Sequence, residues 1–115
     1  MIRGEIRLVN LDPVIGAEAN KRRPAVLVSN DGANATAARL GRGVVTVVPV
    51  TSNVARVHPF QVKLSTEATG LRAVSKAQAE QVRSVAVQRI GPRIGRVSAE
   101  VMEQIDEALR LHLAL

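Results

Sequence analysis

The chain contains no cysteine, only two histidines and a single aromatic residue, Phe60. The lack of cysteine excludes disulfide bonds, thiolate metal sites and cysteine nucleophiles. His58 and His112 share no ligand spacing and are too few for most zinc sites, so we expect neither a metal nor a cofactor. Aromatic platforms for single-stranded bases are also missing, and any stacking on bases would fall to arginine planes.

Long apolar runs are absent as well. No stretch approaches membrane-spanning length, and Met1–Asn10 mixes charged and apolar residues without the pattern of a cleaved leader. We therefore expect a cytoplasmic protein with no membrane association. The 115 residues, 46% of them apolar, fit a single domain over residues 1–115. A domain of this size has little stability to spare, and burial against a second copy in a homodimer would add to it.

Positive charge is in excess. Sixteen Lys and Arg against ten Asp and Glu give a net charge of +6. This excess favours a polyanionic partner, which could be nucleic acid, an anionic membrane surface or an acidic protein segment. All but three of the cations are arginine, whose planar fork matches phosphate and can stack on bases. The arginine content therefore favours nucleic acid.

The hydropathy pattern predicts many short strands. Gly4–Leu11 alternates with period two, as expected of a strand, and Val14–Arg22 has no periodicity and is expected to be a mobile loop. The β-branched run Val44–Val50 predicts a strand buried on both faces, with Pro49 near its end. Further strands are expected at Ala25–Ser29, Phe60–Leu64, Ala73–Lys76, Gln81–Ala86 and Ile94–Val97.

Two helices are predicted beside these strands. Asn30 and Asp31 are good N-caps for a short helix over Asn34–Leu40, after the second strand. Ser98 can cap a C-terminal helix that packs across the strands. One face of that helix carries Val101, Ile105, Ala108, Leu109 and His112. The expected fold is α+β, mostly β, with the strands forming a small barrel.

Standard hydrolase templates are missing: the chain has no G-x-S-x-G elbow, Walker loop or H-E-x-x-H motif. What remains is the basic run Lys21–Pro24, where the loop meets a strand, and the hydroxyl-rich Thr51–Asn53 after a buried strand. RNA carries its own nucleophile, the 2′-hydroxyl, so a nuclease can act by fixing geometry and neutralising the scissile phosphate. Taken alone, the basic run fits a solvated loop equally well, and Thr51 more often binds a turn backbone.

Five segments occur in order along most of the chain: G-E-I-(x)4-L-D-P, G-x-E-(x)4-R-P-A-V-(x)2-S, V-V-P-V-T-S-N, P-F-x-V-x-L and E-Q-V-R-S. In this order the chain resembles the MazF/PemK family, toxins of type II toxin-antitoxin systems. The resemblance implies a dimer of SH3-like small barrels of the CcdB/PemK type. It also implies metal-independent, sequence-specific cleavage of single-stranded RNA that leaves 2′,3′-cyclic phosphate and 5′-hydroxyl ends, and so inhibits translation and growth.

The resemblance also assigns candidate site residues. The family's catalytic arginine, directly before proline, falls on Arg23, and its catalytic threonine falls on Thr51. Because arginine stays protonated, we expect Arg23 mainly to stabilise the charge of the phosphorane. Thr51 would hydrogen-bond a phosphoryl oxygen, and Glu18 would accept a proton or position the 2′-hydroxyl. The residues expected to bind RNA are Asn20, Lys21, Arg22, Ser52, Asn53, Gln81 and Arg83.

Two positions depart from the family pattern: Arg7, where many relatives carry Trp or Tyr, and Asn10, where they carry an acidic residue. At the position of Arg7, the plane of an arginine side chain would take the place of the aromatic ring that stacks on a base. The RNA sequence that a relative cleaves therefore does not transfer to this chain.

The family further implies a partner, an acidic MazE-like antitoxin whose tail folds along the basic groove and blocks RNA. DNA would be contacted only indirectly, through that complex. Two other functions compete. CcdB-like toxins share the barrel and the dimer but poison DNA gyrase without catalysis, and a third possibility is a non-catalytic nucleic-acid binder. The arginine-proline and V-P-x-T pair favours the nuclease.

Overall fold

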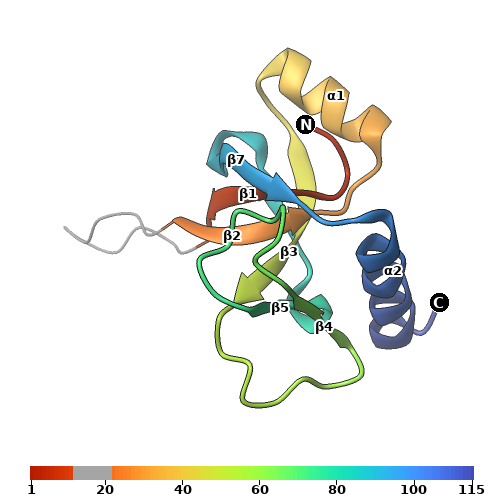
Figure 1. Ribbon diagram of the computed structural model, residues 1–115. Helices are drawn as coiled ribbons and strands as arrows, with labels where there is room; N and C mark the ends of the chain where they lie inside the picture. Colours follow the sequence, from red (N-terminus) through yellow and green to blue (C-terminus); the bar gives the residue numbers. More distant parts are fainter. Residues whose placement is uncertain (12–21) are drawn as a thin grey trace, which may run out of the picture.

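The computed structural model describes residues 1–11 and 22–115. Figure 1 shows a mostly β structure with one helix at the top of the view and another at the right. The strands are β1 (Glu5–Asn10), β2 (Arg22–Leu27), β3 (Val44–Thr51), β4 (Gln61–Leu64), β5 (Ser75–Gln78), β6 (Arg83–Ala86) and β7 (Ile90–Arg96). The helices are α1 (Asp31–Leu40) and α2 (Ala99–Leu113), with short 3-10 turns η1 (Ala79–Gln81) and η2 (Val87–Arg89). The predicted fold class, with a helix after strand two and another at the C-terminus, is confirmed.

The seven strands form one antiparallel sheet in the order β4-β5-β3-β2-β1-β7, with β6 also paired to β3. β4 and β7 end this path, and the pairings of the described strands do not join them, so the sheet is not closed and the small barrel is not confirmed. A loop covers the gap instead. The segment 65–74 between β4 and β5 reaches β7 (Figure 1), where the Arg96 N–H donates to the Ala68 carbonyl over 3.1 Å.

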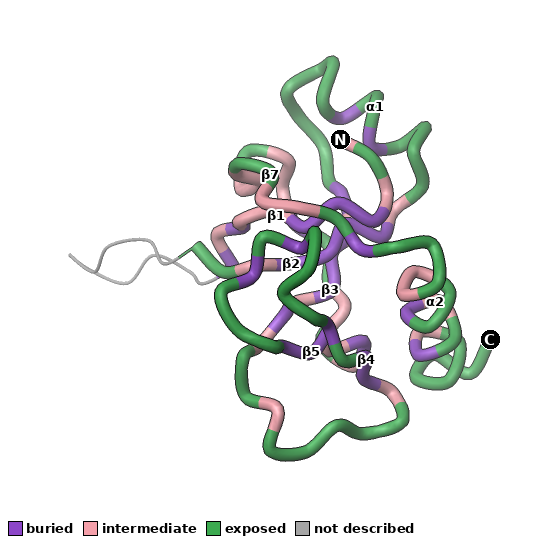
Figure 2. The backbone as a smooth tube through the Cα atoms, viewed as in Figure 1, coloured by how far each residue is buried: buried purple, intermediate pink, exposed green. Residues whose placement is uncertain are grey.

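Two clusters of buried apolar side chains make up the core. One includes residues of α2, and the other includes a residue of α1. Val48 and Val50 belong to the first cluster and Val45 and Val47 to the second, so β3 is buried on both faces, as the β-branched run predicts. Figure 2 shows this strand as largely buried at the centre of the fold. Thr51, at the end of β3, therefore follows a strand that is packed on both faces.

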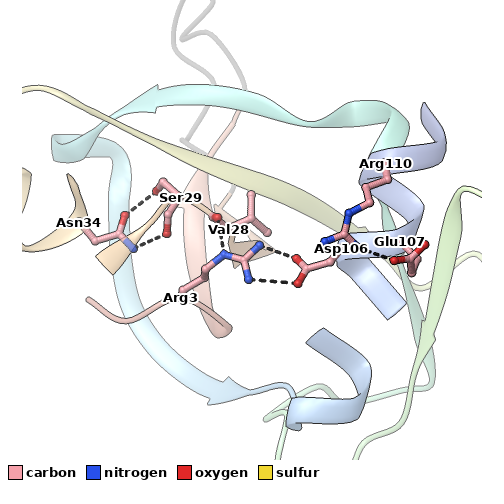
Figure 3. Close-up of polar contacts among 7 residues, drawn as sticks. All are labelled: Arg3, Val28, Ser29, Asn34, Asp106, Glu107 and Arg110. Carbon is pink, nitrogen blue, oxygen red and sulfur yellow. Dashed lines mark hydrogen bonds and ion pairs between the residues drawn. The ribbon is translucent and has the colours of Figure 1, made fainter. Parts of the chain in front are cut away.

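Polar side chains tie both helices to the sheet (Figure 3). The Arg3 guanidinium donates to the two carboxylate oxygens of Asp106 in α2, at 2.5 and 3.5 Å, and its Nε donates to the Val28 carbonyl at 2.8 Å. The fully buried Asn34 of α1 donates to the Ser29 carbonyl at 2.8 Å and accepts from the Ser29 hydroxyl at 2.5 Å. These bonds join α1 to the residues that follow β2, and α2 to the residues that precede β1. Neither helix in the described part of the chain is both long and apolar enough to cross a membrane.

The predicted capping residues Asn30 and Ser98 are confirmed, but some boundaries differ. Asn30 caps α1 by accepting from Ala33 N at 2.8 Å, and this brings the helix start forward to Asp31. Ser98 caps α2 by accepting from Val101 N at 3.2 Å. Val101, Ile105, Ala108 and Leu109 are buried or half-buried on one face of α2, and His112, near the C-terminal end of the helix, is exposed.

Pairing with β1 accounts for two longer strands. β2 begins at Arg22, earlier than predicted, because Arg22 and Arg23 pair with the end of β1. β7 begins at Ile90 for the same reason, and it tolerates Pro92 because it is the last strand of the sheet. In contrast, Gln81 was expected to start a strand but lies in η1, and β6 begins only at Arg83.

Candidate active site

The ends of β2 and β3 bring together two of the predicted site residues. The antiparallel register pairs Ala25 with Pro49. Continued by two residues towards the start of β2, the same register places Arg23 level with Thr51. Both residues line one cavity of about 550 Å³. The arginine and the threonine that the sequence analysis singled out therefore share a cavity, although they lie 28 positions apart in the chain.

The cavity has an apolar wall and a cationic rim. Its apolar lining comes from β1, β2, β3, β7 and the loop 65–74, through Leu8, Pro24, Val50, Leu71, Ala73 and Ile94. Ser52, Gly70 and Ser75 also line it, together with two cations, Arg23 and Arg72. Among the described residues that line the cavity there is no Asp or Glu. Such a surface attracts an anion and lets an uncharged sugar or base pack beside it.

Thr51 stabilises the turn that follows β3. Its Oγ1 accepts a hydrogen bond from Asn53 N at 3.2 Å, and the Asn53 side chain accepts from Ala55 N at 3.3 Å. Thr51 thus does bind a turn backbone, the simpler of the two roles that the sequence left open. A hydroxyl that accepts one bond still has a hydrogen to donate. The turn therefore orients the half-buried Thr51 hydroxyl without using its donor.

The other predicted RNA-binding residues are more dispersed. Ser52 lines the cavity beside Thr51, and Asn53 is exposed in the following turn. Arg22 starts β2, and its guanidinium lies so near Gly91 that a Cβ there would be 3.0 Å from it. Gln81 is exposed in η1 and does not line this cavity. Glu18, Asn20 and Lys21 lie outside the described residues.

Arg83 is partly engaged by the backbone. Its guanidinium donates to the Leu11 carbonyl at 2.9 Å, and Arg89 donates to the Asn10 carbonyl at 3.4 Å. The two arginines together hold the end of β1. Because a guanidinium has five N–H groups, Arg83 retains donors for a further partner, but its backbone bond also gives it a structural role.

Arg7, one of the two positions at which the sequence analysis noted a departure from the family pattern, is bound within the sheet. Its Nε donates to the Gly91 carbonyl at 2.9 Å, and its guanidinium contacts Glu5 at 3.3 Å, as does that of Arg93. Burial raises the pKa of Glu5, but the hydrogen bond from Ile2 N and the positive charges of Arg7, the N-terminus and Arg93 outweigh it and hold that pKa below its usual value. Arg7 thus neutralises a buried carboxylate, and this contact competes with the base stacking expected of it.

Both histidines contact the ring of Phe60. The His58 ring stacks on Phe60 with centroids 5.2 Å apart, and the His112 ring is tilted at 6.5 Å. Within residues 1–11 and 22–115, no three His, Asp or Glu side chains gather into a group that could hold a metal ion.

A sequence model of the family described as the PemK-like, MazF-like toxin of type II toxin-antitoxin systems matches residues 2–113. The chain belongs to this family. The resemblance of the five ordered segments is thereby confirmed, because the match covers nearly the whole chain.

Similar proteins of this toxin family are named endoribonucleases. The chain is 66% identical to Endoribonuclease MazF9 of Mycobacterium tuberculosis, over all of its own length and 98% of that protein. It is 30% identical to Endoribonuclease EndoA of Bacillus subtilis, over 98% of its own length and 94% of the relative. The names of these relatives confirm the prediction that the chain is an endoribonuclease.

Solved structures agree on the fold. MazF from Deinococcus radiodurans is 27% identical and superposes with a TM-score of 0.76 over 100% of this chain and 97% of that one. A mycobacterial endoribonuclease solved in complex with its cognate antitoxin superposes with a TM-score of 0.78, over 100% of this chain and 96% of that one. At 23% identity, the second likeness concerns the fold alone.

The sequence analysis missed one of the two cations among the described residues that line the cavity, Arg72. It is one of many arginines, it follows a glycine and a leucine in a segment without a recognised motif, and no spacing links it to Arg23. Only the folding of the loop 65–74 onto β7 brings it to the same cavity as Arg23 and Thr51.

Proposed function

We propose that the protein is the endoribonuclease toxin of a type II toxin-antitoxin pair, and that it cleaves single-stranded RNA at specific sequences without a metal ion. The observation that carries the proposal is the shared cavity of Arg23 and Thr51, a cationic and hydroxyl-bearing site without a lining carboxylate among the described residues. Membership of the family supports the same conclusion. Cleavage of messenger RNA in the cytoplasm would inhibit translation and growth.

The proposed reaction uses the nucleophile of the substrate. The 2′-oxygen of the RNA attacks the adjacent phosphorus and forms the O2′–P bond, and the P–O5′ bond breaks. The products are a 2′,3′-cyclic phosphate and a 5′-hydroxyl. The proton of the 2′-hydroxyl leaves to a base, and the departing O5′ gains one. The protein therefore needs to align the phosphate and stabilise its extra charge, and it need not supply a nucleophile.

Arg23 and Thr51 suit these tasks. The Arg23 guanidinium would pair with the non-bridging oxygens, and this interaction would become stronger as negative charge develops on the phosphorane. The guanidinium could also donate the proton that O5′ requires. The Thr51 hydroxyl, oriented by Asn53 N, would donate to a phosphoryl oxygen. We assign to Glu18 the acceptance of the 2′-hydroxyl proton, or its positioning, from the resemblance of its motif.

Sequence choice would come from residues around the cavity. Ser52 lines the cavity itself, and Asn53 and Arg22 flank it in the chain. We propose that these three, with Asn20, Lys21, Gln81 and Arg83, contact the bases and phosphates next to the cut. Of these, Arg83 would bind RNA with the donors that the Leu11 carbonyl leaves free.

We also propose two protein partners. A homodimer would bury more of the small core, and an acidic MazE-like antitoxin would cover the cationic cavity and exclude RNA. DNA would be contacted only through that complex. Binding to an acidic antitoxin peptide should weaken as salt is added, because the attraction depends on unscreened charge. Binding that does not change with salt would instead indicate a mainly apolar interface.

The decisive experiment is incubation of the purified protein with a long single-stranded RNA in EDTA, with the cut ends mapped. The wild type should give discrete cuts with cyclic-phosphate ends, and Arg23→Ala and Thr51→Ala should give none. Arg42→Ala, which removes an exposed arginine outside the cavity, should cut like the wild type. Intact RNA, or cutting that persists in the two site variants, would contradict the nuclease or its site. Inhibition of DNA gyrase supercoiling, the activity of the CcdB-like alternative, would then be measured.

A further inference from the structure

Arg72 shares the cavity with Arg23 and Thr51 but has no role in the site described so far. It lies in the loop 65–74, which Figure 2 shows as a mostly exposed segment between β4 and β5. The side chain of Arg72 is exposed, whereas that of Leu71 beside it is buried in the core. The positive charge of Arg72 therefore lies at the proposed active site, and the neighbouring residue Leu71 is anchored in the core.

The backbone that carries Arg72 is fixed on both sides. Gly70 has φ +72°, and it packs so closely on β7 that a Cβ would lie 1.9 Å from the Ile94 carbonyl oxygen. Thr69 is buried, and its hydroxyl donates to the Ser65 carbonyl at 2.7 Å. On the other side, the Ser75 hydroxyl donates to the Ala73 carbonyl at 2.9 Å. The loop presents Arg72 from a set position, as a preorganised binding site requires.

The guanidinium of Arg72 is also available. Arg7 and Arg83 donate to carbonyl oxygens, whereas no hydrogen bond or ion pair to the described part of the chain holds Arg72. The described lining of the cavity contains no Asp or Glu that could neutralise it. Among the described residues, none accepts a hydrogen bond from its five N–H donors, whose fork arrangement matches a phosphate.

We propose that Arg72 binds a phosphate of the RNA next to the scissile one, and so positions the strand in the cavity. This inference rests on the proposed function. Arg23, level with Thr51, takes the scissile phosphate, and the apolar residues that line the same cavity can pack against the adjoining sugar or base. Arg72 is a positioning residue: its loss raises the KM for RNA and leaves kcat nearly unchanged, because its contact is the same in substrate and transition state.

Binding under varied salt gives the first test. The wild type is used to map a cut site, and an oligonucleotide around that site is made uncleavable by 2′-O-methylation of the cut nucleotide. Removing one phosphate contact should lower the slope of log K against log salt by about 0.7, because one fewer counterion site is displaced. Arg72→Ala and Arg72→Gln should show this smaller slope and roughly three- to tenfold weaker binding. Arg42→Ala, with the same change of charge, should keep the wild-type slope.

Replacing single phosphates of the RNA by an uncharged group then locates the phosphate that Arg72 contacts. Each phosphate of the oligonucleotide is replaced in turn by a methylphosphonate. At one position beside the scissile phosphate, the replacement should weaken binding to the wild type and not weaken it further for Arg72→Ala, the non-additivity expected of two groups in contact. Arg42→Ala should lose affinity at that position as the wild type does.

The outcomes separate the two proposals. If the wild type cuts and binds RNA, but Arg72→Ala keeps its salt slope and responds to every methylphosphonate like the wild type, the role of Arg72 is wrong and the nuclease stands. A fall in kcat with an unchanged KM would also overturn the positioning role. If the wild type neither cuts nor binds RNA, the proposed function fails and this inference fails with it.

Discussion

Lys76 lies directly opposite Thr51 in the antiparallel pair of β3 and β5, and its ammonium donates a 2.6 Å hydrogen bond to the Arg56 carbonyl. The lysine side chain is buried, which is unusual for this residue type. It therefore links the strand beside the proposed catalytic threonine to the segment 52–60 that follows it. The position of Ser52 and Asn53 depends on this bond as well as on the turn at Thr51.

Lys76→Met should loosen the segment 52–60 while keeping the core packed, because Met fills a similar volume without the ammonium. Loss of a hydrogen bond of about 1 kcal/mol would raise the open population of the segment roughly fivefold. Trypsin cleavage after Arg56, followed by mass spectrometry of the fragments, measures this opening. Lys63→Met is the matched control, because Lys63 pairs with Lys76 on β4 but is exposed. Equal cleavage of the two variants would contradict the anchoring role.

Thr51→Val should slow cleavage strongly with little loss of RNA binding. Val keeps the shape of Thr and removes the hydroxyl that would donate to the phosphoryl oxygen. The loss of one such donor typically lowers kcat roughly 100- to 1,000-fold. Thr51→Ser, which retains the hydroxyl, should keep most of the activity. Single-turnover cleavage of a short RNA measures the effect, and a Val variant as active as the Ser variant would rule out this role for the hydroxyl.

Gly70→Ala should destabilise the protein more than Gly41→Ala does. Both glycines have a left-handed φ, +72° and +64°, so the conformational cost of alanine is similar at the two sites, about 1 kcal/mol. Only Gly70 faces a backbone atom: its Cβ would lie 1.9 Å from the Ile94 carbonyl oxygen, whereas nothing lies within 4 Å at Gly41. The clash should add about 2 kcal/mol or more. Urea unfolding of both variants gives the difference, and equal losses would show that the loop yields to the extra methyl group.

The sequence predicts the fold through local signals. The β-branched run of β3 indicates a strand buried on both faces, and the caps Asn30 and Ser98 indicate where the two helices begin. The predicted strand boundaries are wrong where pairing with a neighbouring strand, and not the local sequence, decides where a strand begins. Arg22 carries no strand signal, and only its pairing with Asn10 makes it part of β2. The closed barrel is not found, because the loop 65–74 and not a strand pairing covers the gap between β4 and β7.

For the candidate site, sequence motifs identify residues within the segments that carry those motifs. They do not identify residues from other parts of the chain that folding brings beside them. Arg23 and Thr51 are recognisable from the family pattern, and the register of β2 and β3 brings them together. Arg72 is not recognisable, because its approach depends on Gly70 packing against β7, a contact with no local signature. The same holds for Arg7, whose contacts with Glu5 and Gly91 arise only in the folded sheet.

Glu5→Gln should lower stability at neutral pH and cost progressively less as the solution is made acidic. The buried carboxylate is paired with Arg7 and Arg93, and its folded-state pKa is below the usual value despite its burial. A group whose pKa is depressed by folding stabilises the protein above its unfolded pKa, about 4.3 for Glu, and this contribution is lost as the pH falls through the folded pKa. Gln can still accept from Ile2 N but carries no charge.

The difference in free energy of unfolding between wild type and Glu5→Gln should therefore be constant above about pH 5 and shrink below about pH 4. At neutral pH we expect it to be about 1–2 kcal/mol, because two guanidinium groups lose a partly buried partner. Urea unfolding at a series of pH values measures it, with the exposed Glu103→Gln as the control for a simple loss of charge. A difference that stays the same down to pH 3 would mean that the Glu5 side chain acts through shape and hydrogen bonding, and that its charge contributes nothing to the pairing of β1 with β7.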